Sequence, residues 1–155
     1  MNENELQTIT VDEFAALVAR ELYLSRDDQA ELARHAETVL QSDARWQAAD
    51  EPIVYYVEDA FRCAREISRE EAAAMLAFAS ELIGERAPML SSTEAARTIS
   101  RFKDAKLVSA WAMPALATAV RQQWMRCPDR EIKPKHYMTS NEATLIVRRF
   151  ATDIQ

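Results

Sequence analysis

A pattern that marks the start of a helix occurs four times along this chain. In each copy an apolar residue precedes Ser or Thr, and Glu follows three positions after the hydroxyl residue, which is Thr10, Ser68, Ser91 or Thr139. In such a capping box the hydroxyl oxygen accepts a hydrogen bond from the third helical N–H, and the Glu carboxylate accepts one from the N–H of the cap residue. Four such starts within 155 residues predict an internal repeat of helices.

Apolar residues at helical spacing follow three of the four boxes. They predict long amphipathic helices after Thr10, Ser68 and Thr139. The box at Ser91 predicts only a short helix that ends near Phe102. The inward residues expected in the long helices are Phe14, Leu17, Val18, Leu22, Ala72, Met75, Leu76, Ala79, Ile83, Ala143, Ile146, Val147 and Phe150.

Three more helices are predicted between the boxes, over 26–41, 53–65 and 107–125. Pro114 lies inside the last of these. Because proline disrupts a helix interior but suits a first turn, it predicts either a kink or the true start of this helix. Two prolines in 127–137 predict a loop there, and no segment has the alternation of a convincing strand.

The composition agrees with an all-α fold. Gly84 is the only glycine, and a β-rich protein of this size would need more glycines for its tight turns. A hydrophobic fraction of 48% is enough for a core, so we expect a single domain over residues 1–155. The two cysteines, Cys63 and Cys127, are too few for a disulfide framework or a zinc site, and we expect buried or half-buried thiols.

The net charge and the chain start restrict partners and localisation. A net charge of −6, without a basic patch that has interleaved aromatic residues, argues against nucleic acid as a partner. No stretch approaches the roughly 20 apolar residues of a transmembrane segment. The first ten residues lack the basic and apolar regions of a signal peptide. Two localisations stay open: the cytoplasm, or the cell surface if the chain is a piece of an exported protein.

No motif of the sequence predicts catalysis. The sequence contains no Gly-rich phosphate loop, nucleophile elbow or His-Glu-x-x-His motif. The glutamates of the four capping boxes are explained by their capping role, so they do not indicate a carboxylate site. We expect His35 at the surface among charged residues and His136 in the predicted loop. Trp124 and Tyr137 flank that loop and are also expected to be exposed. We therefore predict a protein that is not an enzyme and holds no cofactor and no structural metal.

The segment 102–150 resembles a repeat of the S-layer homology (SLH) family. Such a repeat opens with Phe-x-Asp and a Trp-Ala helix start, continues through a Pro-containing approach, and closes with a helix that begins Ile-Thr-Arg-Ala-Glu-Ala. Here these elements occur in the same order at 102–104, 111–112, 132–135 and 138–143. The order and spacing of a whole repeat are therefore kept.

Weaker copies of these elements occur upstream. Residues 67–76 resemble the closing half of a repeat, within a degenerate copy over 50–84, and residues 9–18 resemble the closing half of a partial copy over 1–24. The resemblance implies a compact, pseudo-three-fold arrangement of helix pairs in which the capping-box helices take part.

The resemblance also implies a function. SLH domains are non-catalytic anchors that bind pyruvylated secondary cell-wall polysaccharide at the bacterial surface, in grooves between repeats. By this resemblance the ligand-binding residues are Arg69, Glu71, Asp104 and Trp111. Arginine binds a carboxylate through two parallel hydrogen bonds, and an indole face can cover a sugar ring.

Two departures from the family pattern support an alternative function. The arginine that follows the hydroxyl residue in the family is present only as Arg69, because Val11, Ser92 and Ser140 occupy that position in the other boxes. The family's turn glycines are also missing. The alternative function is a helical protein–protein interaction module on an SLH-like scaffold that has lost glycan binding. The expected partner is thus either a bacterial cell-wall polysaccharide or another protein.

Overall fold

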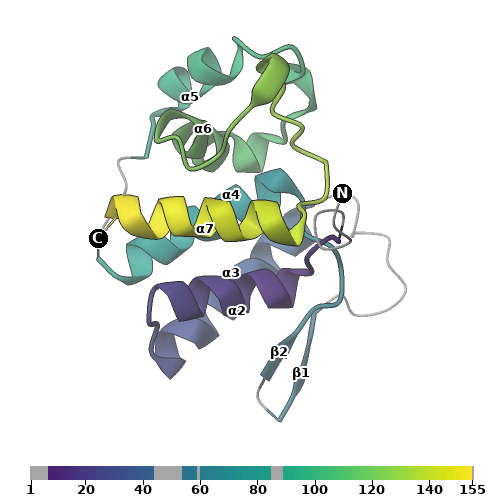
Figure 1. Cartoon of the computed structure of the whole chain (residues 1–155), viewed down its shortest axis with the longest axis vertical. Coiled ribbons are helices and arrows are strands. Elements are labelled where there is room, and N and C mark those ends of the chain that lie inside the picture. The colour runs from purple at the N-terminus through teal and green to yellow at the C-terminus, as the bar shows by residue number, and fades with distance from the viewer. Residues whose placement is uncertain (1–6, 44–53, 59, 85–88, 155) are drawn as a thin grey trace.

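The computed structural model describes residues 7–43, 54–58, 60–84 and 89–154, which are mostly helical. Figure 1 shows helix α7 lying across the middle of the molecule, with α5 and α6 on one side of it and α2 and α3 on the other. The prediction of a mainly helical protein is confirmed. The helices are α2 (Val11–Glu21), α3 (Arg26–Ser42), α4 (Arg69–Leu82), α5 (Ser92–Ile99), α6 (Met113–Arg121) and α7 (Ser140–Ile154).

Helices α2, α4 and α7 start from a closed ring of three backbone hydrogen bonds. The N–H of Ile9 donates to the carbonyl of Met138 at 3.0 Å, the N–H of Met138 donates to Ile67 at 2.9 Å, and the N–H of Ile67 donates to Ile9 at 3.1 Å. Each ring residue directly precedes the hydroxyl residue of a capping box, and all three side chains are buried. The ring therefore joins three segments that are far apart in the sequence at the points where their helices begin.

The capping boxes form to different extents. At Thr10 and Ser68 both hydrogen bonds of the box are present. At Thr139 the hydroxyl accepts from the N–H of Glu142 at 3.1 Å, but the Glu142 carboxylate forms an ion pair with Arg69. The prediction that a complete capping box forms at each of the four positions is therefore wrong. At Thr139 a tertiary contact takes the glutamate that the local pattern assigned to its own helix end. At Ser91 the hydroxyl accepts from the N–H of Glu94 at 3.2 Å, without the reciprocal bond from the glutamate.

We expect Thr139→Ala to lower the free energy of unfolding by about 1 kcal/mol, because the substitution removes the oxygen that caps α7. The matched control is Thr144→Ala on the same helix. The Thr144 hydroxyl donates to the helix's own Ser140 carbonyl, and alanine favours a helix interior, so this variant should match or slightly exceed the parent. Urea unfolding of both variants measures the difference, and equal effects would mean that the cap contributes nothing.

A short β-hairpin replaces one predicted helix. Strands β1 (Tyr55–Val57) and β2 (Ala60–Arg62) pair antiparallel, with Tyr56 opposite Phe61 and their ring centroids 6.2 Å apart. The predictions of a helix over 53–65 and of no strand are therefore wrong, although residues 53 and 59 lie outside the described chain. Aromatic and β-branched residues favour extended backbone, and the cross-strand ring pair adds to that preference.

Helix α6 is shorter than predicted. The helix expected over 107–125 extends only over Met113–Arg121, and two single 3-10 turns, Ala105–Leu107 and Ala110–Ala112, precede it. Pro114 lies in its first turn, so the second of the two alternatives for this proline is confirmed. Its missing N–H costs nothing there, since first-turn N–H groups have no partner within the helix. The predicted loop over 127–137 is confirmed and contains one 3-10 turn, Pro128–Arg130.

One hydrophobic core joins the described helices, and all the inward residues predicted for the long helices belong to it, with Ile83 half-buried at its edge. The prediction that Trp124 is exposed is wrong. This tryptophan is completely buried, its ring meets that of Phe150 edge-on at 4.8 Å, and its indole N–H donates to Asp153 at 2.8 Å. Tyr137 is 41% exposed, as predicted. The predictions of a buried and a half-buried thiol for the two cysteines are also confirmed.

Candidate functional site

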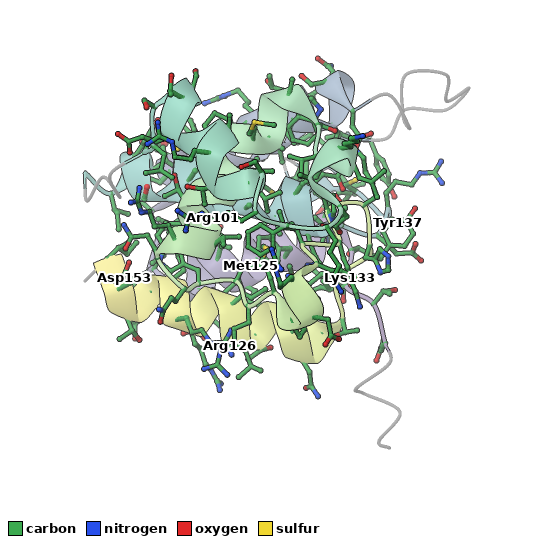
Figure 2. All side chains as sticks on the ribbon, turned by 90° about the horizontal axis from the view of Figure 1, so that it is seen from above. Arg101, Met125, Arg126, Lys133, Tyr137 and Asp153 are labelled. Atoms are coloured by element: carbon green, nitrogen blue, oxygen red, sulfur yellow. The ribbon has the colours of Figure 1, made fainter. Side chains whose placement is uncertain are left out.

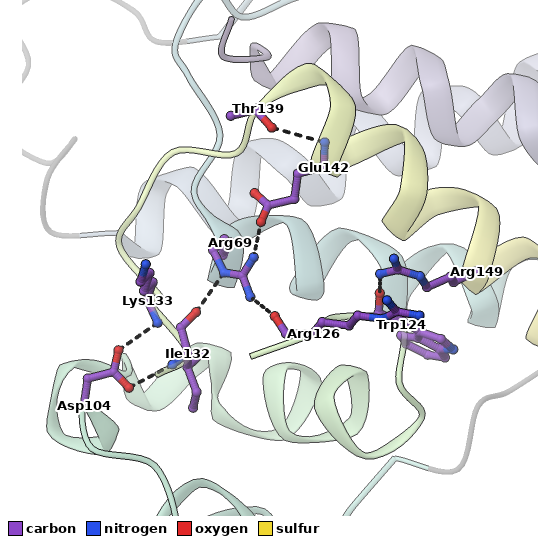
Figure 3. Close-up of polar contacts among 9 residues, drawn as sticks. All are labelled: Arg69, Asp104, Trp124, Arg126, Ile132, Lys133, Thr139, Glu142 and Arg149. Carbon is purple, nitrogen blue, oxygen red and sulfur yellow. Dashed lines mark hydrogen bonds and ion pairs between the residues drawn. The ribbon is translucent and has the colours of Figure 1, made fainter. Parts of the chain in front are cut away.

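Arg69, the first residue of α4, contacts two other segments, the loop between α6 and α7 and the first turn of α7 (Figure 3). Its guanidinium donates through Nε to the carbonyl of Ile132 at 2.7 Å and through Nη2 to the carbonyl of Arg126 at 2.8 Å. Nη1 forms an ion pair with the carboxylate of Glu142, in the first turn of α7. Only 5% of Arg69 is exposed. All three guanidinium nitrogens thus have partners within the protein.

The position of Arg69 explains why these partners are needed. A cation in the first helical turn opposes the helix dipole and is unfavourable there without compensation. Burial adds a desolvation cost, which the Glu142 carboxylate and two carbonyls offset. Arg69 therefore ties the start of α4 to the start of α7 and to the loop between α6 and α7. The predicted role of this arginine in binding a ligand stays a prediction, and a ligand would have to replace one of these partners.

Asp104 and Glu71 also make internal bonds. Asp104 accepts from the backbone N–H of Ile132 at 2.9 Å and from that of Lys133 at 2.7 Å. Burial alone would raise the pKa of Asp104, but these hydrogen bonds outweigh it and lower the pKa below its usual value. The backbone of Ile132 is thus held at both ends, because its N–H donates to Asp104 and its carbonyl accepts from Arg69. The Glu71 carboxylate accepts from the N–H of Ser68 at 2.8 Å and completes the cap of α4.

Glu70 is a buried polar residue that the sequence analysis missed. Its side chain is fully buried and accepts from the N–H of Ser109 at 3.0 Å, from the Ser109 hydroxyl at 2.8 Å and from Lys135 Nζ at 2.5 Å. It fixes the segment just before α6 and the loop before α7 to α4. Its position next to Arg69 in a capped first turn was the only local signal, and that signal is equally typical of an exposed glutamate.

Trp111 lies at a different site, a groove of about 280 Å³ between α3, α4 and the start of α6. The groove has an aromatic wall, because the His35 and Phe78 rings stack with centroids 4.0 Å apart and planes within 6°. Trp111 is half-buried and lines the same groove. None of the other three predicted site residues lines it. The structure therefore brings Arg69 and Asp104 together around Ile132 and leaves Trp111 apart from them.

His35 is half-buried rather than a plain surface residue, which corrects the sequence prediction. Burial lowers its pKa below the usual value, against opposing effects of the Glu81 carboxylate and of a hydrogen bond with the backbone of Ala74. The imidazole is therefore neutral at pH 7. The wall of the groove consequently presents a neutral aromatic surface, with the exposed Glu81 carboxylate at its edge.

No protein-family model, curated protein or solved structure matches this chain. Within residues 7–43, 54–58, 60–84 and 89–154, no group of three or more His, Cys, Asp or Glu residues is arranged to hold a metal ion. Over the same residues, no helix has the length and apolar character that crossing a membrane requires.

Proposed function

We propose that this chain is a non-catalytic binding module with an SLH-like, pseudo-three-fold arrangement of helix pairs, and that it attaches to acidic polysaccharide of a bacterial cell wall. The observation that carries the proposal is the hydrogen-bond ring of Ile9, Ile67 and Met138, from which α2, α4 and α7 start. Three repeats would form such a ring if each supplied one extended residue before its capping box.

The groove beside Trp111 supports a sugar ligand. This tryptophan belongs to the Trp-Ala element of the best-preserved repeat, and the stacked rings of His35 and Phe78 line the same groove. Flat aromatic faces pack well against the apolar faces of sugar rings. In this proposal Glu71 and Asp104 hold the scaffold. Arg69 can meet an acidic group of the polymer only when that group replaces Glu142.

A second candidate function is protein binding, and the chemistry of the same groove favours it. Most of the remaining lining is apolar: Val39, Ala74, Ala77, Met89 and Ala115. The Arg69 guanidinium, which the family resemblance assigns to an acidic ligand, already bonds to three partners within the protein. The occupant that fits is a protein segment with an apolar side chain beside a basic one, since the exposed Glu81 carboxylate lies at the groove.

A sedimentation assay with purified bacterial cell walls tests the first proposal. We expect the parent to bind intact walls and not walls from which the secondary polymer has been extracted. Trp111→Ala should weaken binding about tenfold, because it removes the largest aromatic face of the groove. Leu145→Ala is the matched control: Leu145 is 51% exposed on α7 and does not line the groove, so this variant should bind like the parent.

The half-buried position of Trp111 requires a second groove variant, because its removal also affects packing. His35→Ala removes the ring that stacks on Phe78 and should weaken wall binding in the same direction. Both variants are compared at temperatures well below their melting points. Failure of the parent to bind intact walls would exclude the glycan proposal. Wall binding that neither groove variant changes would exclude this groove as the glycan site.

A further inference from the structure

A second cleft lies between α5 and α6, with a volume of about 470 Å³. Glu94, Arg97 and Thr98 line it from α5, at the i, i+3 and i+4 spacing that places residues on one helical face, and Arg101 lines it just beyond the end of that helix. Arg121, the last residue of α6, lines the other side, together with the half-buried Phe102. This cleft shares no lining residue with the groove beside Trp111.

The cleft concentrates positive charge in a chain whose net charge is −6. Three arginines line it, whereas Glu94 supplies the single carboxylate among the described lining residues. Glu94 Oε2 lies 3.5 Å from Arg121 Nη1, and both side chains are more than half exposed, so this pair is weak. Within the described chain no ion pair or hydrogen bond engages the guanidinium of Arg97 or Arg101.

A fourth arginine lies at the same corner. Arg130 Nη2 donates to the carbonyl of Arg101 at 3.0 Å, and this bond holds the loop after α6 against the end of α5. Figure 2 labels Arg101 near the ribbons of these two helices. Three arginines beside a single carboxylate, Glu94, leave an excess of positive charge that raises the energy of the folded protein, and an anion that enters the cleft relieves this repulsion.

We propose that this cleft binds an anionic oxygen ligand, a carboxylate or phosphate group, through Arg97 and Arg101. Guanidinium groups bind both kinds of anion through pairs of parallel hydrogen bonds. Arg121 adds charge on the opposite side of the cleft, and Phe102 offers an apolar surface to the rest of the ligand. The cleft shares no lining residue with the Trp111 groove, so the proposal stands whether or not that groove binds a glycan.

Titration with inorganic phosphate and with pyruvate, each at ionic strength held constant with sodium chloride, tests this proposal. Constant ionic strength separates specific binding from charge screening. We expect saturable chemical-shift changes in the amide NMR spectrum, centred on α5 and the end of α6, with dissociation constants in the millimolar range. Arg97→Gln and Arg101→Gln should each weaken binding about tenfold, the loss expected for one charge-assisted contact.

Two further variants separate a site from general charge attraction. Arg148→Gln makes the same charge change at an exposed residue of α7 that does not line the cleft, and it should bind like the parent. Glu94→Gln removes the competing carboxylate and releases Arg121, so it should tighten binding. Equal weakening in Arg97→Gln, Arg101→Gln and Arg148→Gln, or shifts that do not saturate, would overturn the proposal.

A competition experiment identifies the source of the anion. Extracted wall polymer that carries acidic groups is added to the protein saturated with phosphate. Displacement of phosphate from the cleft, with the polymer causing shifts at the same amides, assigns the acidic group to the polymer. Retention of phosphate assigns the cleft to a small free anion. The cell-wall sedimentation assay is also carried out with Arg97→Gln, which changes the cleft and leaves the Trp111 groove intact. Loss of wall binding through the groove and loss of anion binding in the cleft are therefore distinguishable.

Discussion

Arg69→Met should lower the free energy of unfolding by about 3 kcal/mol, the lower end of the range for breaking a buried ion pair. Methionine fills a similar volume but leaves the carbonyls of Ile132 and Arg126 without their donor. The loss stays at the lower end because the Glu142 side chain is 34% exposed and can be rehydrated. Chemical denaturation monitored by circular dichroism measures the effect.

The matched control for Arg69→Met is Arg148→Met, which removes an exposed arginine from α7 and should stay within about 0.5 kcal/mol of the parent. Glu142→Gln keeps an acceptor for Arg69 and should cost less than Arg69→Met. In the double variant, the two losses should add to more than the measured total, since both remove the same ion pair. An Arg69→Met protein as stable as the parent would mean that the bonds of this guanidinium make no net contribution to the stability of the fold.

Trp124→Ala should lower the free energy of unfolding by about 3–5 kcal/mol, the range for truncating a buried aromatic residue. The indole is fully buried against Phe150, so the substitution leaves a cavity, and it also removes the hydrogen bond from the indole N–H to the exposed Asp153. Trp124→Phe keeps most of the volume and should lose clearly less. Thermal and urea unfolding of both variants give the comparison.

Leu145→Ala serves as the control for Trp124→Ala, because Leu145 is a large apolar residue of α7 that is 51% exposed. Its truncation should change stability by no more than about 0.5 kcal/mol. A loss below about 1 kcal/mol for Trp124→Ala would contradict the burial of this side chain and would restore the expectation that it lies at the surface.

Local signals in the sequence determined where most helices begin and which faces they bury. The hydroxyl caps at Thr10, Ser68 and Thr139 act within one helical turn, so their effect depends on nearby residues alone. Helical spacing of apolar residues likewise predicted the buried face of each long helix. Pro114 narrowed the start of α6 to two alternatives, because its missing N–H is tolerated in a first turn and not in a helix interior.

The hairpin over β1 and β2 shows where local signals were insufficient. Residues 53–65 contain apolar residues at helical spacing, but they are also rich in strand-forming residues such as Tyr55, Tyr56 and Val57. A short apolar run of this kind fits either structure by its spacing. The pairing of Tyr56 with Phe61 across the two strands favours the hairpin over the helix. Helical spacing does not reveal this pair, because it forms only when the chain turns back on itself.

The roles of the candidate site residues were decided by the tertiary structure. From the sequence, Arg69 is a cation placed against a helix dipole, which indicates that a compensating partner exists but not which one. Its partners come from residues 126, 132 and 142, far along the chain. Glu70, in the same first turn, has no sequence signal that separates it from an exposed acid, yet it is completely buried beneath Ser109 and Lys135.

The ring of Ile9, Ile67 and Met138 depends both on local sequence signals and on tertiary contacts. That an apolar residue precedes each of these three helix caps can be read from the sequence, because each capping pattern spans only a few neighbouring positions. That the three residues bond to one another follows from the folded structure, since each hydrogen bond joins segments separated by dozens of residues. Local propensity can place a helix end, but the free energy that selects which ends meet comes from burial and hydrogen bonding between distant segments.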